Sequence, residues 1–188
     1  VERAAGHGFD VRYAPRRPGD STAVVAGADQ VRSVLGWKPK HADLDFIVAA
    51  NAALAVESED QPLDSTLLRP GVQTVLADPA LGRYYLAEVD GQVVGQLMTT
   101  YEWSDWRNGV FLWIQSVYVL PAHRGAGVFR ALYQHLAGLA TKDDRICGIR
   151  LYVDRDNARA QKVYTRLGMH LSNYQVMQTV YRGPESHG

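Results

Sequence analysis

Apolar residues recur along this 188-residue chain with two different periods, which predict helices first and then a run of strands. From Asp43 they fall at helical spacing and predict a helix to about Val56, with Asp43 as its N-cap. A second helix is expected after an acidic loop, with its end marked by Asp78-Pro79. Pro70-Gly71 lies inside that second helix and is expected to break or kink it.

The segment RYYLAEVDGQVVGQLMTTYEW has the clearest hairpin pattern in the chain. Two β-prone runs, at about Tyr84–Val89 and Gln92–Tyr101, are joined by Asp90-Gly91, a pair that tolerates the positive φ angles of a type I′ turn. The apolar run VFLWIQSVYVL follows the polar turn SDWRNG. We expect it to form a central strand that pairs antiparallel with the strand before it.

Pro121 ends that strand, and another helix is expected beyond it. Apolar residues mark one face of this helix: Phe129, Leu132, Tyr133, Leu136, Leu139 and Ala140. A strand at IRLYV, a helix at NARAQKVYTRLG that Gly168 ends, and a last strand at QVMQTVY complete the pattern. This order of helices and strands is typical of an α/β domain.

The composition indicates which classes of partner to expect and which cellular compartment the protein suits. Lys and Arg together number 20, as do Asp and Glu, so no overall field draws the chain toward nucleic acid or an acidic membrane. The apolar runs fall far short of the roughly 18 residues that span a bilayer. The single cysteine, Cys147, lies in an apolar run and suits a small buried side chain in a reducing compartment. We therefore expect a cytoplasmic protein without nucleic-acid or membrane partners.

Residues 1–41 differ from the rest in being rich in Arg, Pro and Gly. They contain the turn-forming stretch APRRPGDS before a short β-prone run, Thr22–Ala26. The predicted organisation is therefore an N-terminal appendage at 1–41, a domain at 42–182 and a tail at 183–188.

The strongest chemical signal is the glycine turn HRGAG that leads into the helix after Pro121. A helix entered through Arg124-Gly125-Ala126-Gly127 presents unpaired N–H groups and the positive end of its dipole. Two missing side chains let an anion approach the backbone, and Arg124 can add a charge-assisted contact. The turn is a candidate pyrophosphate cradle, although by itself it is more typical of a glycine turn that lets strand and helix pack closely.

A second motif supplies context for that turn. Asn157 stands at the N-cap of the later helix, and Ala160 and Tyr164 follow on one helical face. The small residue leaves room for a ligand, and the phenol of Tyr164 can transfer a proton.

Together the two motifs resemble the GNAT superfamily of acetyl-CoA-dependent N-acetyltransferases, over about residues 43–181. IQSVYVLPAHRGAGVFRALY is similar to the family's strand, Arg-x-x-Gly-x-Gly/Ala loop and helix, and NARAQKVYTRLGM is similar to its second cofactor motif. The resemblance implies an α/β (α+β) fold with a mixed, mostly antiparallel, splayed central sheet and helices on both faces. It implies Tyr164 as the acid that protonates the departing thiolate, with no metal. The implied acetyl-CoA contacts are Val117, Tyr118, Val119, Arg124, Gly125, Ala126, Gly127, Val128, Phe129 and Asn157.

Two positions depart from the family pattern. Phe129 replaces the final small residue of the loop, so its ring must point away from the phosphates or the cradle is narrower than usual. The stretch TTYEWSDWRNGVFLWIQSVYV most resembles the diamine-type branch, where a glutamate falls at the place of Gln115. Gln115 cannot take a proton, although it can orient a water or the acceptor amine.

The acceptor side offers several candidates. Glu102 and Asp105 can accept the amine's proton through water, and they also suit solvated turn positions. Trp103, Trp106 and Trp113 can wall an acceptor pocket, pack a core or make the contact of a homodimer.

The leading hypothesis is transfer of acetyl from acetyl-CoA to a primary amine of a small molecule, diamine or amino-acid-like, by direct attack in a ternary complex. Two alternatives remain: a CoA-binding or acetyl-CoA-binding module without turnover, suggested by Gln115, and acetylation of a protein amine.

Residues 11–48 are similar to the C-terminal tail of UDP-glucose 4-epimerases, including RRPGD and LGWKP. The glycine fingerprint for NAD and the Tyr-x-x-x-Lys pair of that enzyme are not found in this sequence, so epimerase activity is not expected. The resemblance makes Asp29–Leu35 helical, whereas the acetyltransferase pattern places a first strand near Val31–Lys38. We expect Thr22–Ala26 to pair on the sheet edge, or the segment to be a passenger from a spliced gene fragment.

Overall fold

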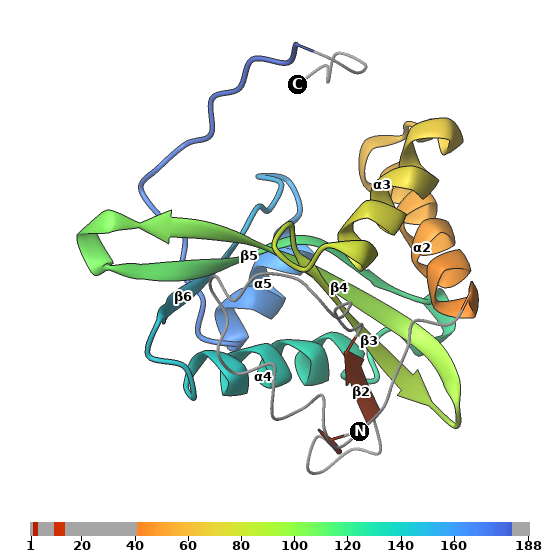
Figure 1. Cartoon of the computed structure of the whole chain (residues 1–188), viewed down its shortest axis with the longest axis horizontal. Helices are drawn as coiled ribbons and strands as arrows, with labels where there is room; N and C mark the ends of the chain where they lie inside the picture. The colour runs from red at the N-terminus through yellow and green to blue at the C-terminus, as the bar shows by residue number, and fades with distance from the viewer. Residues whose placement is uncertain (1, 4–9, 14–40, 182–188) are drawn as a thin grey trace. The chain divides into compact units, whose positions relative to one another are not determined.

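The computed structural model describes residues 2–3, 10–13 and 41–181, which fall into two units. The described residues through Tyr152 form the larger unit, and those from Val153 form the smaller one. The larger unit holds a six-stranded sheet whose strands follow one another in chain order (Figure 1). The strands are β1 Glu2–Arg3, β2 Asp10–Tyr13, β3 Arg83–Val89, β4 Gln92–Ser104, β5 Gly109–Val119 and β6 Ile146–Leu151.

The sheet is mixed and mostly antiparallel, as predicted. Each neighbouring pair from β1 to β5 is antiparallel, and only β5 and β6 are parallel. A parallel pair needs a crossover, which α4, Val128–Ala140, supplies between the two strands.

Helices cover both faces of this sheet, which confirms the predicted layers (Figure 1). On one face α4 packs its Leu132 and Leu136 into a core cluster with Leu97 and Leu112 of β4 and β5. On the other face α2, His41–Glu59, and α3, Ser65–Ala77, bury a second cluster. The buried members of the second cluster are Leu44, Ile47, Val72, Tyr84, Leu86 and Met98.

The β3–β4 hairpin turns as its sequence predicts. Asp90 and Gly91 have φ angles of 51° and 78°, the left-handed values that a type I′ turn requires. The strand after the turn runs to Ser104, three residues beyond its predicted end, because β5 pairs with it along its whole second half.

Two predictions for the helices were wrong. Helix α2 begins at His41, so Asp43 lies in its first turn, buried, and is not the N-cap. Helix α3 continues through Pro70 without the predicted break, and Val72, two residues later, is buried. Asp64 caps the start of α3, and Asp78 ends it as expected. Among the described residues, no helix is long and apolar enough to cross a membrane.

The outer edge of β3 is occupied by a strand from the predicted appendage. Asp10–Tyr13 pairs antiparallel with Tyr85–Glu88, so the neighbour of β3 is not the Thr22–Ala26 run that we expected to pair at the edge. Thr22–Ala26 itself and the predicted helix at Asp29–Leu35 lie outside the described residues.

The expected last strand, at residues 175–181, was also wrong. These residues form no ladder with any described strand, since β6 ends the order of the sheet. Their large side chains are correspondingly exposed, with Met177 at 96% and Tyr181 at 91%. Cys147, expected to be buried, is only partly buried on β6.

Candidate functional site

Strand β5 changes register at Gln115. Ser116 pairs with Met98 and Ile114 pairs with Thr99, so Gln115 is an extra residue on β5 without a direct partner on β4. Its side chain is exposed, and its Nε2 donates a hydrogen bond to Thr100 Oγ1 at 2.9 Å. Such a bulge bends a strand and leaves local backbone groups outside the regular ladder.

Beyond this bulge, β5 has a free edge toward β6. The parallel ladder joins Val110–Ile114 to Ile146–Leu151 and ends there, so no described strand pairs with that edge at residues 115–119. This is the splay that the family resemblance implied. Main-chain groups of Val117 and Tyr118 can therefore bond an extended ligand in the manner of an added strand.

The glycine turn continues directly from that edge. A short 3₁₀ helix, η2, Pro121–His123, leads to Gly125 and Gly127, which have φ angles of 81° and 90°. Gly127 is the N-cap of α4 without a side-chain cap, and the first helical bond runs from the amide of Ala131 to Gly127. The amides at the start of α4 therefore have no acceptor within the helix.

This turn has room for an anion. A Cβ added at Gly125 or at Gly127 would meet no atom within 4 Å, so the space beside both residues is open. Open space, unpaired amides and the positive end of the α4 dipole are what a phosphate group needs.

Arg124 does not extend into this space. Its Nε donates to the carbonyl oxygen of Val119 at 2.9 Å, and its Nη2 donates to Glu57 Oε2 at 2.7 Å. The guanidinium also lies over the ring of Tyr118, with Cζ 5.3 Å from the ring centre. The Arg124 side chain is therefore not placed for the direct phosphate contact that the sequence predicted. The carbonyl oxygen of Val119 already accepts one hydrogen bond.

Phe129 leaves the cradle open. Its side chain packs against the core cluster under α4 and lies tilted against Tyr133, with ring centres 6.2 Å apart. The bulky residue that departs from the family loop therefore contributes to the core.

A model of the GNAT acetyltransferase family matches residues 48–169. The chain belongs to this family. A solved structure described as a possible acetyltransferase from Clostridium difficile 630 is 35% identical, with a TM-score of 0.74, and the match covers 93% of this chain and 99% of that one.

More distant acetyltransferases share the fold. An aminoglycoside N-acetyltransferase in complex with CoA gives a TM-score of 0.64 at 14% identity, covering 97% of this chain and 99% of the other. A ribosomal-protein-alanine N-acetyltransferase from Brucella melitensis biovar Abortus 2308 gives 0.58 at 19% identity, covering 74% and 93%. At these identities the likeness shows the fold alone. The diamine-type branch stays a prediction.

The similarity to UDP-glucose 4-epimerases is confirmed over a short segment. The enzyme of Azospirillum brasilense is 50% identical over 48 residues, and that of Rhizobium meliloti (strain 1021) is 49% identical over 41 residues. These matches cover 26% and 22% of this chain but only 14% and 12% of the two epimerases.

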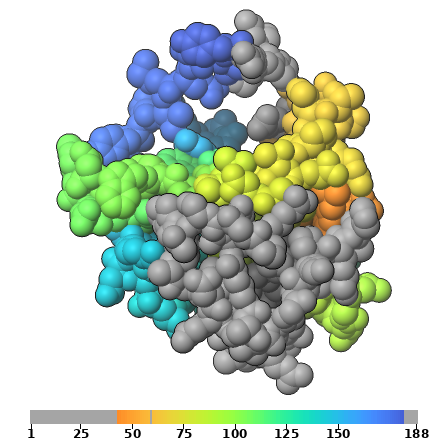
Figure 2. Space-filling view, in the orientation of Figure 1, coloured from red at the N-terminus to blue at the C-terminus, as the bar shows by residue number. Residues whose placement is uncertain are grey.

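The candidate residues for binding the acceptor do not gather in one place. Glu102 pairs with Phe111 across the ladder and Trp103 pairs with Val110, so Glu102 and Trp103 face opposite sides of the sheet. Trp103 and Trp106 are 59% and 86% exposed at the end of the β4–β5 hairpin, which is the green left edge of Figure 2. The three tryptophans therefore do not wall one pocket.

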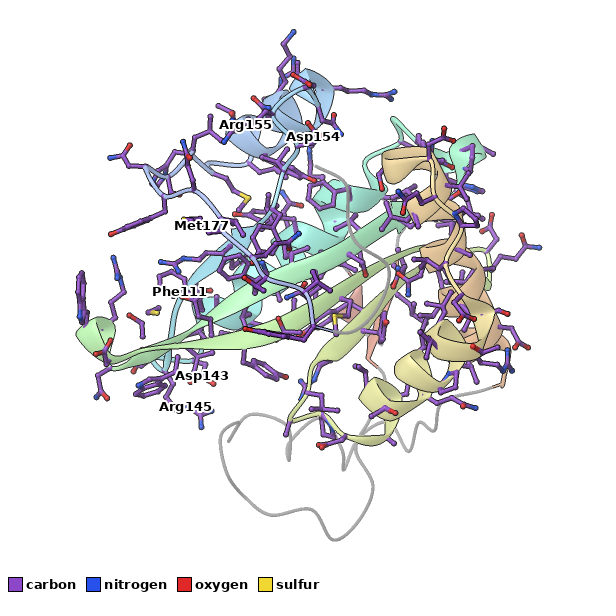
Figure 3. The ribbon with its side chains drawn as sticks, turned by 90° about the horizontal axis from the view of Figure 1, so that it is seen from above. Phe111, Asp143, Arg145, Asp154, Arg155 and Met177 are labelled. Atoms are coloured by element: carbon purple, nitrogen blue, oxygen red, sulfur yellow. The ribbon has the colours of Figure 1, made fainter. Side chains whose placement is uncertain are left out.

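Glu102 belongs instead to a stacked cluster on β4, β5 and β6. Its Oε1 accepts a hydrogen bond from Arg150, and the Arg150 guanidinium lies 3.7 Å from the centre of the ring of Phe111, the residue of this cluster that Figure 3 labels. Trp113 packs against Tyr152 beside it, at 4.7 Å between ring centres. Asp105, in the 3₁₀ turn η1 Asp105–Arg107, accepts a bond from the amide of Trp106. Both carboxylates therefore have partners.

The second cofactor motif lies in the smaller unit. Asn157 caps α5, Ala158–Arg166, as predicted, with its side chain accepting from the amide of Ala160 at 2.9 Å. Gly168 ends the helix with a φ of 88°, and Met169 and Gly168 donate to the carbonyls of Tyr164 and Thr165. A tyrosine phenol is protonated at neutral pH, and burial raises the pKa of the Tyr164 phenol further.

Sequence reasoning missed two residues that shape the site. Glu57 falls beyond the predicted end of its helix and meets Arg124 across 67 positions of sequence. Arg150 was not singled out, although it alternates with apolar residues in β6. A cation within an otherwise apolar strand was the one available signal for it.

Proposed function

We propose that this acetyltransferase moves an acetyl group from acetyl-CoA to a primary amine of a small molecule, diamine or amino-acid-like, by direct attack in a ternary complex. The observation that carries the proposal is the continuity of the free β5 edge, the glycine turn and the start of α4. The edge suits the amide groups of pantetheine, and the open turn suits the pyrophosphate.

The residues then have separate tasks in the reaction. The amine nitrogen attacks the thioester carbonyl, the carbon–sulfur bond breaks, and an amide forms. The backbone N–H near Val117 stabilises the oxyanion, and Gln115 orients the incoming amine. Tyr164 supplies the proton that the departing thiolate takes, and the proton that the nitrogen loses as it becomes an amide restores the phenol. Asn157 contacts the cofactor beside its thiol end.

The amine must lose its proton before it attacks, and Gln115 cannot accept it. Glu102 and Asp105 already accept hydrogen bonds from Arg150 and from the Trp106 amide. We therefore propose that the neutral amine is captured from solution. Because an alkylamine has an ordinary pKa of about 10.4, kcat/KM for the amine should rise tenfold per pH unit below that value.

Calorimetry with CoA, followed by CoA-thiol release in the presence of acetyl-CoA and an amine panel, tests the proposal. The panel contains diamines, amino acids and a short peptide with a free N-terminus. Release with a diamine or an amino acid is the expected result. Binding without release from any amine would favour the CoA-binding module that Gln115 suggests, and release from the peptide alone would favour a protein acceptor. Absence of CoA binding would overturn the proposal.

The aromatic end of the β4–β5 hairpin also bears on assembly. Exposure of Trp103 and Trp106 supports a homodimer through this end, which stays a proposal until the mass in solution is measured.

A further inference from the structure

The end of α2 is tied to the glycine turn by a three-residue cluster formed by Glu57, Tyr118 and Arg124. Both carboxylate oxygens of Glu57 accept hydrogen bonds, Oε1 from the Tyr118 hydroxyl at 3.0 Å and Oε2 from Arg124 Nη2 at 2.7 Å. Arg124 in turn donates to the Val119 carbonyl, the last residue of β5. The cluster therefore connects α2, the end of β5 and the first residue of the glycine turn.

The position of Glu57 is unfavourable for the helix that carries it. Glu57 lies in the last turn of α2, where the helix dipole is negative and where no basic residue of the helix compensates. It also places a negative charge beside a turn that is suited to an anion. Both effects cost free energy, so neither helix stability nor charge attraction for a phosphate explains this residue.

We propose that Glu57 is a positioning residue for the cofactor cradle, an inference that rests on the function proposed above. By holding the guanidinium of Arg124 against Val119, Glu57 fixes the chain direction at the entry to Gly125 and Gly127. The amides at the start of α4 then face the open side of the turn before the ligand arrives. Arg124 acts through the loop backbone rather than by touching the phosphates.

A competing role for Glu57, as a rival of phosphate for Arg124, predicts the opposite change in CoA affinity. If Glu57 merely competed with phosphate for Arg124, removal of its charge would free the guanidinium and tighten CoA binding. If Glu57 positions the turn, its removal weakens CoA binding even though a negative charge has left the neighbourhood. The sign of the change in the dissociation constant therefore decides between the two roles.

The experiment measures the dissociation constant for CoA by calorimetry, the acetyl-CoA KM, kcat and the melting temperature. Glu57→Ala should weaken CoA binding and raise KM about tenfold, the loss expected for one hydrogen bond to a charged group. Its kcat should stay within about twofold, because the reacting atoms are not touched. Glu57→Gln, which keeps an oxygen acceptor, should lose less affinity and melt no lower than the wild type.

Two further variants make the test specific. Asp45→Ala removes a comparable ion pair of the same helix, between Asp45 Oδ1 and Arg69 Nη2 at 2.8 Å, and should leave CoA binding unchanged. The double variant Glu57→Ala, Arg124→Ala should bind CoA no more weakly than Arg124→Ala alone, because both changes break the same unit. Additive losses would overturn the inference.

The two proposals fail in different ways. Normal or tighter CoA binding by Glu57→Ala, with binding by the wild type intact, would overturn the positioning role and leave the acetyltransferase function standing. Absence of CoA binding by the wild type would overturn both.

Discussion

The carboxylate of Glu57 and the guanidinium of Arg124 meet at 2.7 Å although 67 residues separate them in the chain. This contact joins α2, which packs on one face of the sheet, to the glycine turn that leads into α4. It shows that the glycine turn is supported from outside its own motif.

Replacement of Tyr164 by phenylalanine tests the proposed acid. The phenol is protonated at neutral pH, as an ordinary tyrosine is, and burial raises its pKa further. Loss of this proton donor should slow departure of the thiolate. We expect kcat to fall at least about tenfold with little change in the affinity for CoA. Tyr174→Phe, at a tyrosine that is 79% exposed, is the matched control and should change neither kcat nor the affinity for CoA. An unchanged kcat in Tyr164→Phe would remove Tyr164 as the acid.

Replacement of Gly127 by alanine tests the cradle. A non-glycine residue at a φ of 90° costs about 1–2 kcal/mol, and the new methyl group enters the open space beside the α4 amides. Gly168→Ala is a matched control, because its φ is 88° and its surroundings are also open, but it ends α5. Both variants should melt lower by similar amounts, and only Gly127→Ala should lose CoA affinity by calorimetry. Equal affinity in the two variants would contradict the cradle.

The stability that the turn before β6 contributes should fall in acid. Asp143 accepts hydrogen bonds from Arg145 Nε and Nη2 at 2.8 and 2.6 Å, and the two side chains lie together in Figure 3. These bonds lower the pKa of Asp143, so the stabilisation is present above the ordinary carboxyl pKa of about 3.9 and is lost as pH falls through the lowered value. Because Arg145 is partly exposed, Asp143→Asn should cost only about 1 kcal/mol at pH 7.

Denaturant unfolding at several pH values measures that difference. The difference in unfolding free energy between Asp143→Asn and the wild type should narrow as the pH falls below the ordinary carboxyl pKa of about 3.9, while Asp45→Asn, at an exposed ion pair, should differ little from the wild type throughout. A gap that persisted unchanged in acid would show that the carboxylate charge is not its source.

Removal of residues 1–38 tests whether the epimerase-like segment contributes to the sheet. The deletion takes away β2 and exposes the edge of β3, where four residue pairs now join the two strands. We expect a lower melting temperature and a stronger tendency to aggregate, because an unpaired edge strand recruits other chains. A shorter deletion of residues 1–8 retains β2 and should have a smaller effect. An unchanged melting temperature after the long deletion would identify the segment as a passenger.

Local chemistry was readable from the sequence, whereas partners distant in the chain were not. The Asp90-Gly91 turn, the Asn157 cap and the Gly168 helix end were predictable because each depends on a few adjacent residues. The break expected at Pro70 was wrong, because a proline removes one hydrogen bond of the helix and the burial of Val72 in the following turn cannot be read from the adjacent sequence. The pairing of Arg124 with Glu57 depends on how α2 lies against β5, which no spacing within either segment reveals.

The extra residue in β5 also changes which side chains of the strand face the core. Before it, the even-numbered Leu112 and Ile114 enter the core beneath α4, and after it the odd-numbered Val117 and Val119 do so. Tyr118 is thereby turned to the opposite face, where its hydroxyl reaches α2. If β5 ran through this point with regular pairing and no bulge, the alternation would place Tyr118 in the apolar layer under α4 and would turn Val117 and Val119 away from it, so the irregularity at Gln115 decides which face each later side chain occupies.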